Sequence, residues 1–185
     1  MTKPRGARDC AFLNAQNKQT IRQIIRPLRA LGVPAIGIVD IDVLKDGGTN
    51  WTDLLDSIGI PKTMHPALGT LRQAIKAAFD GTLKDMKRDG GVALLKPADQ
   101  AACTELFDLL RAYGLFVVPG GELESWLPAL GVKGHTPGWL VSMFQLMKEQ
   151  PTDPGYVAPG PDDVWDFMRR VGAWLSDLAR KGMPG

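Results

Sequence analysis

The sequence predicts a small α/β domain in which helices cover both faces of a short parallel sheet of about three or four strands, followed by a helical C-terminal extension. Two short apolar runs, residues 35–39 and 115–118, are followed directly by acidic or glycine-rich loops. Between and after them, apolar residues recur at helical spacing. Short apolar runs that alternate with helical segments are typical of buried parallel strands. We therefore expect the α/β domain to span residues 9–130 and the extension to span residues 131–185.

The N-terminal part is predicted to form a strand, a helix and a second strand. Residues 10–13 are a short apolar run and are expected to be the first strand. A helix is predicted next, because apolar residues recur at helical spacing over residues 21–31. Asn17 and Lys18 stand at the start of this helix, where amide donors and a cation suit a phosphate group. A solvated helix start with no ligand is an equally open interpretation.

The second predicted strand ends in two carboxylates. Asp40 and Asp42 are two residues apart, so on an extended chain their side chains leave the same side. They follow the carboxyl end of a predicted parallel strand, which is where ligands bind in open α/β sheets. Hard cations prefer oxygen ligands, so the pair is a candidate metal site. The alternative is that one aspartate caps the following turn and the other is solvated.

A second pair of acids follows the other predicted strand. Glu122 and Glu124 come directly after the loop of residues 119–121, at the same end of the sheet as the two aspartates. Apolar residues at 123, 126, 127 and 130 predict a helix that begins here. Acids in a first helical turn are often only partners of the helix dipole. Their position after a strand and a glycine loop instead favours one shared acidic site.

The remaining periodic segments predict further helices. Asp162 and Asp163 are expected to cap the last of them, and Pro137 is expected to open the one before it. The predicted segments are residues 51–55, 68–86, 102–113, 137–147 and 163–178.

Composition limits the classes of function. The net charge of +2 is too small to indicate nucleic-acid binding without local clustering. No apolar run approaches the ~20 residues that span a bilayer, so we expect no membrane association. Cys10 and Cys103 are far apart and form no CxxC motif. We therefore expect a reducing compartment, the cytoplasm.

The chain resembles the TOPRIM domain at the C-terminus of OLD-family (overcoming lysogenization defect) ATP-dependent nucleases. The resemblance covers roughly residues 9–130, and it depends on three segments in order. These are Phe12-Leu13-Asn14-Ala15-Gln16-Asn17-Lys18, then Leu28-Arg29-Ala30-Leu31-Gly32-Val33-Pro34 leading into Ile38-Val39-Asp40-Ile41-Asp42, and finally Val117-Val118-Pro119-Gly120-Gly121-Glu122-Leu123-Glu124.

The resemblance implies a Rossmann-like parallel sheet whose acids bind Mg²⁺ or Mn²⁺ and cleave the phosphodiester bonds of DNA. By resemblance, Asp40 and Asp42 are metal ligands and catalytic residues, and Glu124 is a further acid of the site with Glu122 as its rival. Lys133 or Lys45 is a candidate for stabilising charge on the phosphate. The implied partners are DNA and an ATPase domain, either upstream in a longer protein or in trans. Assembly into a homo-oligomer is a further open alternative.

The chain departs from the family pattern at two points. TOPRIM domains begin with a strand that carries a glutamate, whereas the first glutamate of this sequence is Glu105. No GxxxxGK[ST] motif of the ATPase module occurs either. We therefore expect either a fragment of a longer protein or a degenerate relative, and a weakly active or inactive nuclease when this polypeptide is isolated.

Two other functions remain open. The segment Asp40-Ile41-Asp42 after an apolar strand also looks like the nucleophile loop of haloacid-dehalogenase-type phosphatases, in which the first aspartate attacks phosphorus. Alternatively, the domain is a regulatory module that binds DNA or an ATPase without cutting. In that case its phosphate contacts could come from either of two basic groups, Lys84, Lys87 and Arg88, or Arg169, Arg170 and Arg180.

Overall fold

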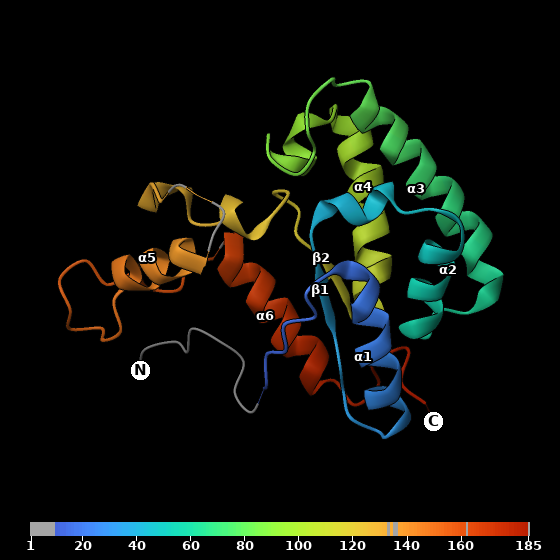
Figure 1. Ribbon diagram of the computed structural model, residues 1–185, viewed down its shortest axis with the longest axis horizontal. Helices are drawn as coiled ribbons and strands as arrows, with labels where there is room; N and C mark the ends of the chain where they lie inside the picture. Colours follow the sequence, from blue (N-terminus) through green and yellow to red (C-terminus); the bar gives the residue numbers. More distant parts are fainter. Residues whose placement is uncertain (1–9, 133, 135–136, 162, 185) are drawn as a thin grey trace.

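The computed structural model describes residues 10–132, 134, 137–161 and 163–184 and is a mixed α/β structure that is mostly helical. Its two strands form a parallel pair with helices on both sides of it (Figure 1). In chain order the elements are α1 (Lys18–Ala30), β1 (Gly37–Val39), α2 (Gly48–Ser57), α3 (His65–Asp80), α4 (Pro97–Ala112), β2 (Leu115–Val117), α5 (Pro137–Met147) and α6 (Asp163–Ser176).

The sheet is smaller than the three or four strands that the sequence suggests. In the described residues it consists of β1 and β2, which pair in parallel with Ile38 opposite Phe116. The predicted strand at residues 10–13 is wrong, because this segment has no regular structure. Phe12 and Leu13 are 70% and 66% exposed, so the run has no buried face with which to join the sheet.

Helices cover both faces of the sheet, as predicted. Val39 and Val117 point into the larger core, which α1, α2, α3 and α4 enclose. Alternate residues of a strand point to opposite faces, and so Ile38 and Phe116 pack instead against α6. On the first face α1 lies very close to the sheet, since a Cβ added at Gly37 would be 3.0 Å from side chains of α1 and of β2.

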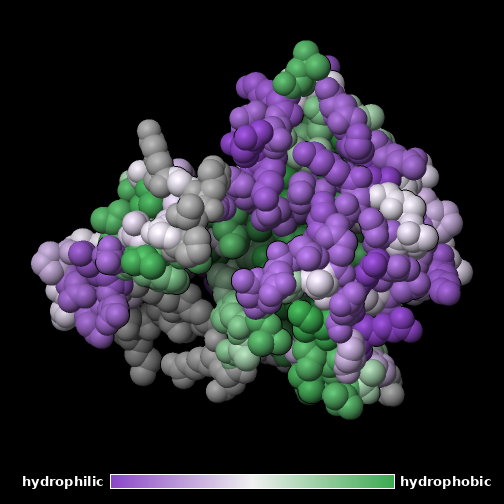
Figure 2. All heavy atoms as spheres, in the orientation of Figure 1, coloured by the Kyte–Doolittle hydropathy of each residue, from purple (hydrophilic) through white to green (hydrophobic). Residues whose placement is uncertain are grey.

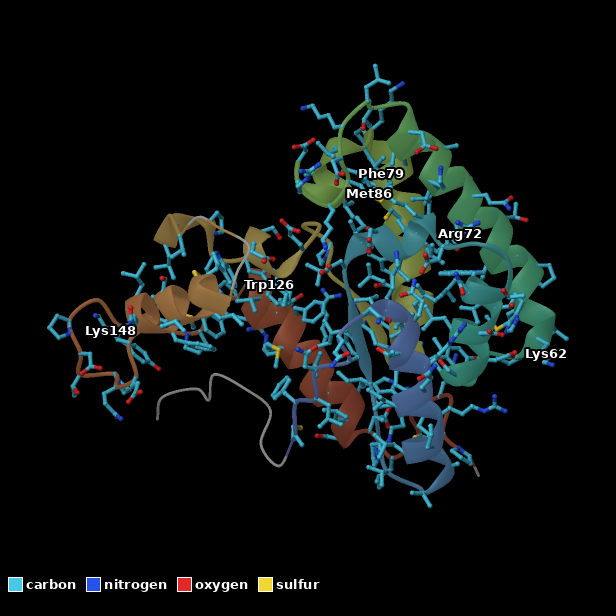
Figure 3. The ribbon with its side chains drawn as sticks, in the orientation of Figure 1. Lys62, Arg72, Phe79, Met86, Trp126 and Lys148 are labelled. Atoms are coloured by element: carbon cyan, nitrogen blue, oxygen red, sulfur yellow. The ribbon has the colours of Figure 1, made fainter. Side chains whose placement is uncertain are left out.

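The C-terminal part contributes the second, smaller core. The ring centroid of Phe167 in α6 lies 5.7 Å from that of Phe116, edge to face, and 5.0 Å from that of Trp126, which lies beside the start of α6 (Figure 3). Helix α5 lies away from the sheet and contains no charged residue. Figure 2 shows hydrophobic surface over α5, whose exposed apolar side chains are Leu140, Val141, Phe144 and Leu146.

A buried arginine joins four parts of the chain. Arg29, near the end of α1, is 3% exposed, and its guanidinium donates to the carbonyl oxygens of Ala35, Ile58, Tyr113 and Gly182. The same group lies 5.0 Å above the ring of Trp174 in α6. Burial lowers the pKa of Arg29 to about 10. This contact ties the C-terminal segment to the ends of α1, α2 and α4.

Two predicted helices differ from the structure. The segment after β2 is not an α-helix but two short 3₁₀ turns, Leu123–Ser125 and Pro128–Leu130. Pro128 cannot continue a helical hydrogen-bond ladder, and Leu127 before it has a left-handed φ of 51°. Helix α3 ends at Asp80 rather than near residue 86, because the chain turns after Gly81. Of the described helices, none is both long and apolar enough to cross a bilayer.

Candidate functional site

The two parallel strands deliver acidic residues to one edge of the sheet. Asp40 follows β1 directly, and Glu122 follows β2 after the loop of residues 119–121. Beyond the strands the two segments stay hydrogen-bonded, since the N–H of Ile41 donates to the carbonyl of Gly121 at 3.0 Å. This backbone contact fixes the two acidic segments side by side, which confirms their predicted placement at one end of the sheet.

Lys87 joins the two acids. Its Nζ lies 2.8 Å from Oδ2 of Asp40 and 3.7 Å from Oε2 of Glu122. The Lys87 and Asp40 side chains are about one-third exposed, whereas the Glu122 side chain is 11% exposed. The hydrogen bond to Asp40 is the largest cause that raises the pKa of Lys87 above its ordinary value, and the charges of Asp40, Asp42 and Glu122 act in the same direction. Two carboxylates from different strand ends therefore share one cation.

The loop that carries Lys87 packs tightly on the glycine loop after β2. The N–H of Val92 donates to the carbonyl of Pro119 at 2.9 Å, and Met86 is buried beneath the loop (Figure 3). Gly91 and Gly121 both have positive φ, and a Cβ on either would collide with backbone atoms of the opposite loop. Glycine is therefore required at both positions for this close approach.

Asp42 belongs to a second ionic group next to the first. The Nζ of Lys18, in the first turn of α1, lies 3.3 Å from Oδ2 of Asp42 and 3.2 Å from Oδ1 of Asp46. It also donates to the main-chain carbonyl of Asp42 at 3.0 Å. Because Asp42 lies in the 3₁₀ turn Ile41–Lys45 rather than in a strand, the alternation that would bring it beside Asp40 does not apply. The two aspartates thus have different lysine partners.

An arginine of α3 supports the turn that carries Asp42. Arg72 is 6% exposed and donates from Nη1 to the carbonyl of Leu44 at 2.7 Å. Its guanidinium also lies 5.6 Å above the ring of Trp51 in α2, and Figure 3 shows it directed from α3 toward this turn. The turn that carries Asp42 is therefore supported by a buried guanidinium that is not one of the exposed charged groups at the edge of the sheet.

The other predicted site residues have varied positions. Asn17 is the N-cap of α1, and its side chain accepts hydrogen bonds from the N–H groups of Gln19 and Thr20, both at 3.0 Å. Lys45 is exposed at the end of the 3₁₀ turn, and its charge helps to lower the pKa of Asp85. Glu124 lies in the 3₁₀ turn Leu123–Ser125 and is partly buried. Lys133 lies outside the described residues.

Glu122 rather than Glu124 shares a cation with Asp40. The resemblance favours Glu124, and the apolar spacing predicts a helix that begins at residue 122. The backbone of Glu122 is instead extended, with φ −137° and ψ 169°, and its Oε2 lies 3.7 Å from Nζ of Lys87. From the sequence, Lys87 is only a candidate surface contact for phosphate. The Gly90-Gly91 pair is the one signal in the sequence for a close loop contact near it.

The donor chemistry of this edge fits a hard divalent ion. Among the described residues, no three histidine, cysteine, aspartate or glutamate side chains are grouped so as to hold a metal. Mg²⁺, however, is commonly bound through one or two carboxylates together with water and substrate phosphate. Asp40 and Glu122 provide two such carboxylates, and the ammonium of Lys87 shows where both can reach one positive charge.

Comparison of the chain with known protein families, with characterised proteins and with solved structures gives no match.

Proposed function

We propose that this chain is the metal-binding part of a DNA endonuclease of the TOPRIM type found in OLD-family ATP-dependent nucleases. The observation that carries the proposal is the meeting of Asp40 and Glu122, from the ends of two parallel strands, at one cation. The order of the segments along the chain adds the resemblance described above. DNA is the proposed substrate, and an ATPase domain is the proposed partner.

In this proposal, Asp40 and Glu122 hold Mg²⁺ or Mn²⁺. Such an ion supplies a Lewis acid that offsets the charge developing on a phosphodiester. The partial burial of Glu122 limits access of water, which strengthens the attraction between its carboxylate and a cation. Asp42 is two residues after Asp40 and pairs with Lys18. Lys45 is exposed next to this group and is the candidate contact for a DNA phosphate.

The test is metal-dependent nicking of supercoiled plasmid DNA. We expect weak nicking by the purified chain in Mg²⁺ or Mn²⁺, reduced about tenfold or more in Asp40→Asn and in Glu122→Gln. The matched control is Asp53→Asn, which removes an aspartate of α2 that pairs with Arg22, away from the strand ends. Nicking that survives chelation of the metal, or that is equal in Asp40→Asn, would contradict the proposal.

A binding module that does not cut is the second candidate. It is favoured by the lysine partners of Asp40 and Asp42, which already neutralise both aspartates without a metal. A gel shift of DNA that persists in EDTA, with no cleavage in any metal, would support this function. Hydrolysis of p-nitrophenyl phosphate without plasmid nicking, lost in Asp40→Asn, would instead support the phosphatase alternative.

A further inference from the structure

Lys87 occupies the position at which the two strand-end acids converge. Its Nζ is 2.8 Å from a carboxylate oxygen of Asp40 and 3.7 Å from one of Glu122. A surface lysine usually has a freely rotating side chain, and its ion pairs contribute little. Here the backbone beneath the side chain is fixed, because Gly121 leaves no room for a Cβ against the carbonyl of Lys87.

Further contacts hold the same loop in place. The N–H of Lys87 donates to Oδ1 of Asp85 at 2.8 Å, and this hydrogen bond is the largest cause that lowers the pKa of Asp85. The N–H of Gly91 donates to the carbonyl of Met86 at 3.1 Å, and Met86 is 3% exposed. The loop therefore holds the main chain of Lys87 in a defined position, from which its side chain reaches both acids.

A cation between the two carboxylates lowers the electrostatic repulsion between them. Like charges that approach within a few ångströms in a partly buried site repel each other, so removing the ammonium would raise the free energy of the metal-free protein. A divalent ion bound by the same oxygens would in turn repel the ammonium. The two cations therefore exclude each other from this pair of oxygens.

We propose that Lys87 is a resident counter-cation which a divalent metal ion must displace from Asp40 and Glu122. The inference rests on the proposed function, because it takes the metal to bind at these two acids. Lys87 lies in the loop between α3 and α4, outside the two strands, so this loop sets the affinity of the two acids for the metal. Lys87 is in this sense a positioning residue that acts through the carboxylates.

The experiment measures Mn²⁺ binding by electron paramagnetic resonance, without DNA and without a nuclease assay. We expect Lys87→Met to bind Mn²⁺ about fivefold more tightly than the original protein, because an ion pair of this exposure is worth up to about 1 kcal/mol. Lys87→Gln is the second neutral variant and should show the same direction. Lys87→Arg keeps the positive charge and should stay within about twofold of the original.

Two controls separate the outcomes. Lys84→Met removes an exposed lysine from the same loop and should leave Mn²⁺ affinity unchanged. Asp40→Asn should abolish Mn²⁺ binding both as a single substitution and when it is combined with Lys87→Met. In the metal-free state, Lys87→Met should lower the melting temperature, and saturating Mn²⁺ should restore it.

The inference about Lys87 and the proposed function fail in different ways. If Asp40→Asn abolishes Mn²⁺ binding while both neutral Lys87 variants bind no tighter than the original, the counter-cation inference is overturned and the metal site stands. If Asp40→Asn leaves Mn²⁺ binding unchanged, the metal site itself is overturned, and the inference is overturned with it.

Discussion

The buried arginine of α1 gives the sharpest test of how this fold is held together. We expect Arg29→Met to lower the free energy of unfolding by about 3 kcal/mol. Arg29 donates five hydrogen bonds to four main-chain carbonyls, with donor-acceptor distances between 2.7 and 3.2 Å. Methionine fills much of the same volume but leaves these carbonyls without their donor.

The magnitude follows from how deeply each accepting carbonyl is buried. A hydrogen bond from a charged donor contributes roughly 1.5–3 kcal/mol, net of the cost of taking both groups out of water. The contacts with Ala35 and Ile58 are buried, whereas those with Gly182 and Tyr113 are partly buried, so water can reach the last two carbonyls once the guanidinium is gone. Counting the two buried carbonyls at the lower bound gives a loss of about 3 kcal/mol.

The assay is urea denaturation followed by tryptophan fluorescence, together with thermal melting. A loss of this size corresponds to a melting temperature lower by about 10 °C for a chain of this length. The matched control is Arg26→Met, an exposed arginine on the same helix, which should change stability by no more than about 0.5 kcal/mol. Arg29→Lys should recover less than half of the loss, because one nitrogen cannot reach carbonyls in four directions.

The reasoning would be refuted by either of two results. A loss below about 1 kcal/mol in Arg29→Met would mean that the carbonyls find water or other donors at little cost. An equal loss in Arg26→Met would mean that the effect comes from the helix and not from the buried guanidinium.

Three further predictions follow from single contacts. Gly91→Ala should destabilise the protein by about 2 kcal/mol or more in urea denaturation, because the added Cβ collides with backbone atoms of the opposite loop. Gly69→Ala, inside α3, adds a Cβ that meets no other atom and should stabilise the protein by about 1 kcal/mol. Similar changes for both substitutions would contradict the close packing of the two loops. Asn17→Ala should cost about 1 kcal/mol of stability by removing the cap of α1, and Asn17→Asp should cost little; equal losses in both would show that capping is not its role. Burial raises the pKa of the Cys103 thiol to about 12. Its folded-state pKa exceeds the unfolded value, so ionisation of Cys103 lowers stability only as the pH rises above about 8.5. Mass spectrometry after iodoacetamide treatment at about pH 8 should therefore find Cys10 modified and Cys103 protected until the chain is unfolded, and early modification of Cys103 would contradict this burial.

The main architecture could be read from local patterns. The apolar runs before Asp40 and before Pro119 form the two parallel strands, and the helices follow the predicted periodicity. These patterns suffice because a strand or an amphipathic helix needs only its own residues to present an apolar face. The run at residues 10–13 is the exception. It is apolar enough for a strand, but strand pairing needs a neighbour that the sequence does not specify.

The sequence predicted where the candidate site lies but not which residues meet there. Placing acids at the carboxyl ends of both strands follows from parallel topology, and the adjacent backbone segments confirm it. Choosing Glu122 over Glu124 required the backbone conformation after Gly121, which is extended at Glu122. The roles proposed for Asp42 and Lys45 stay predictions.

The sequence by itself determined the two buried strands, most of the helices, and that carboxylates follow both strands. Only the tertiary structure decided which cations those carboxylates meet. Lys87 is distant in the chain from both Asp40 and Glu122, and its position depends on two glycine loops that pack against each other. Likewise, the carbonyls that hold Arg29 come from four separate segments. Ion pairs and buried hydrogen bonds depend on distances in space, and a local pattern of residues carries no information on those distances.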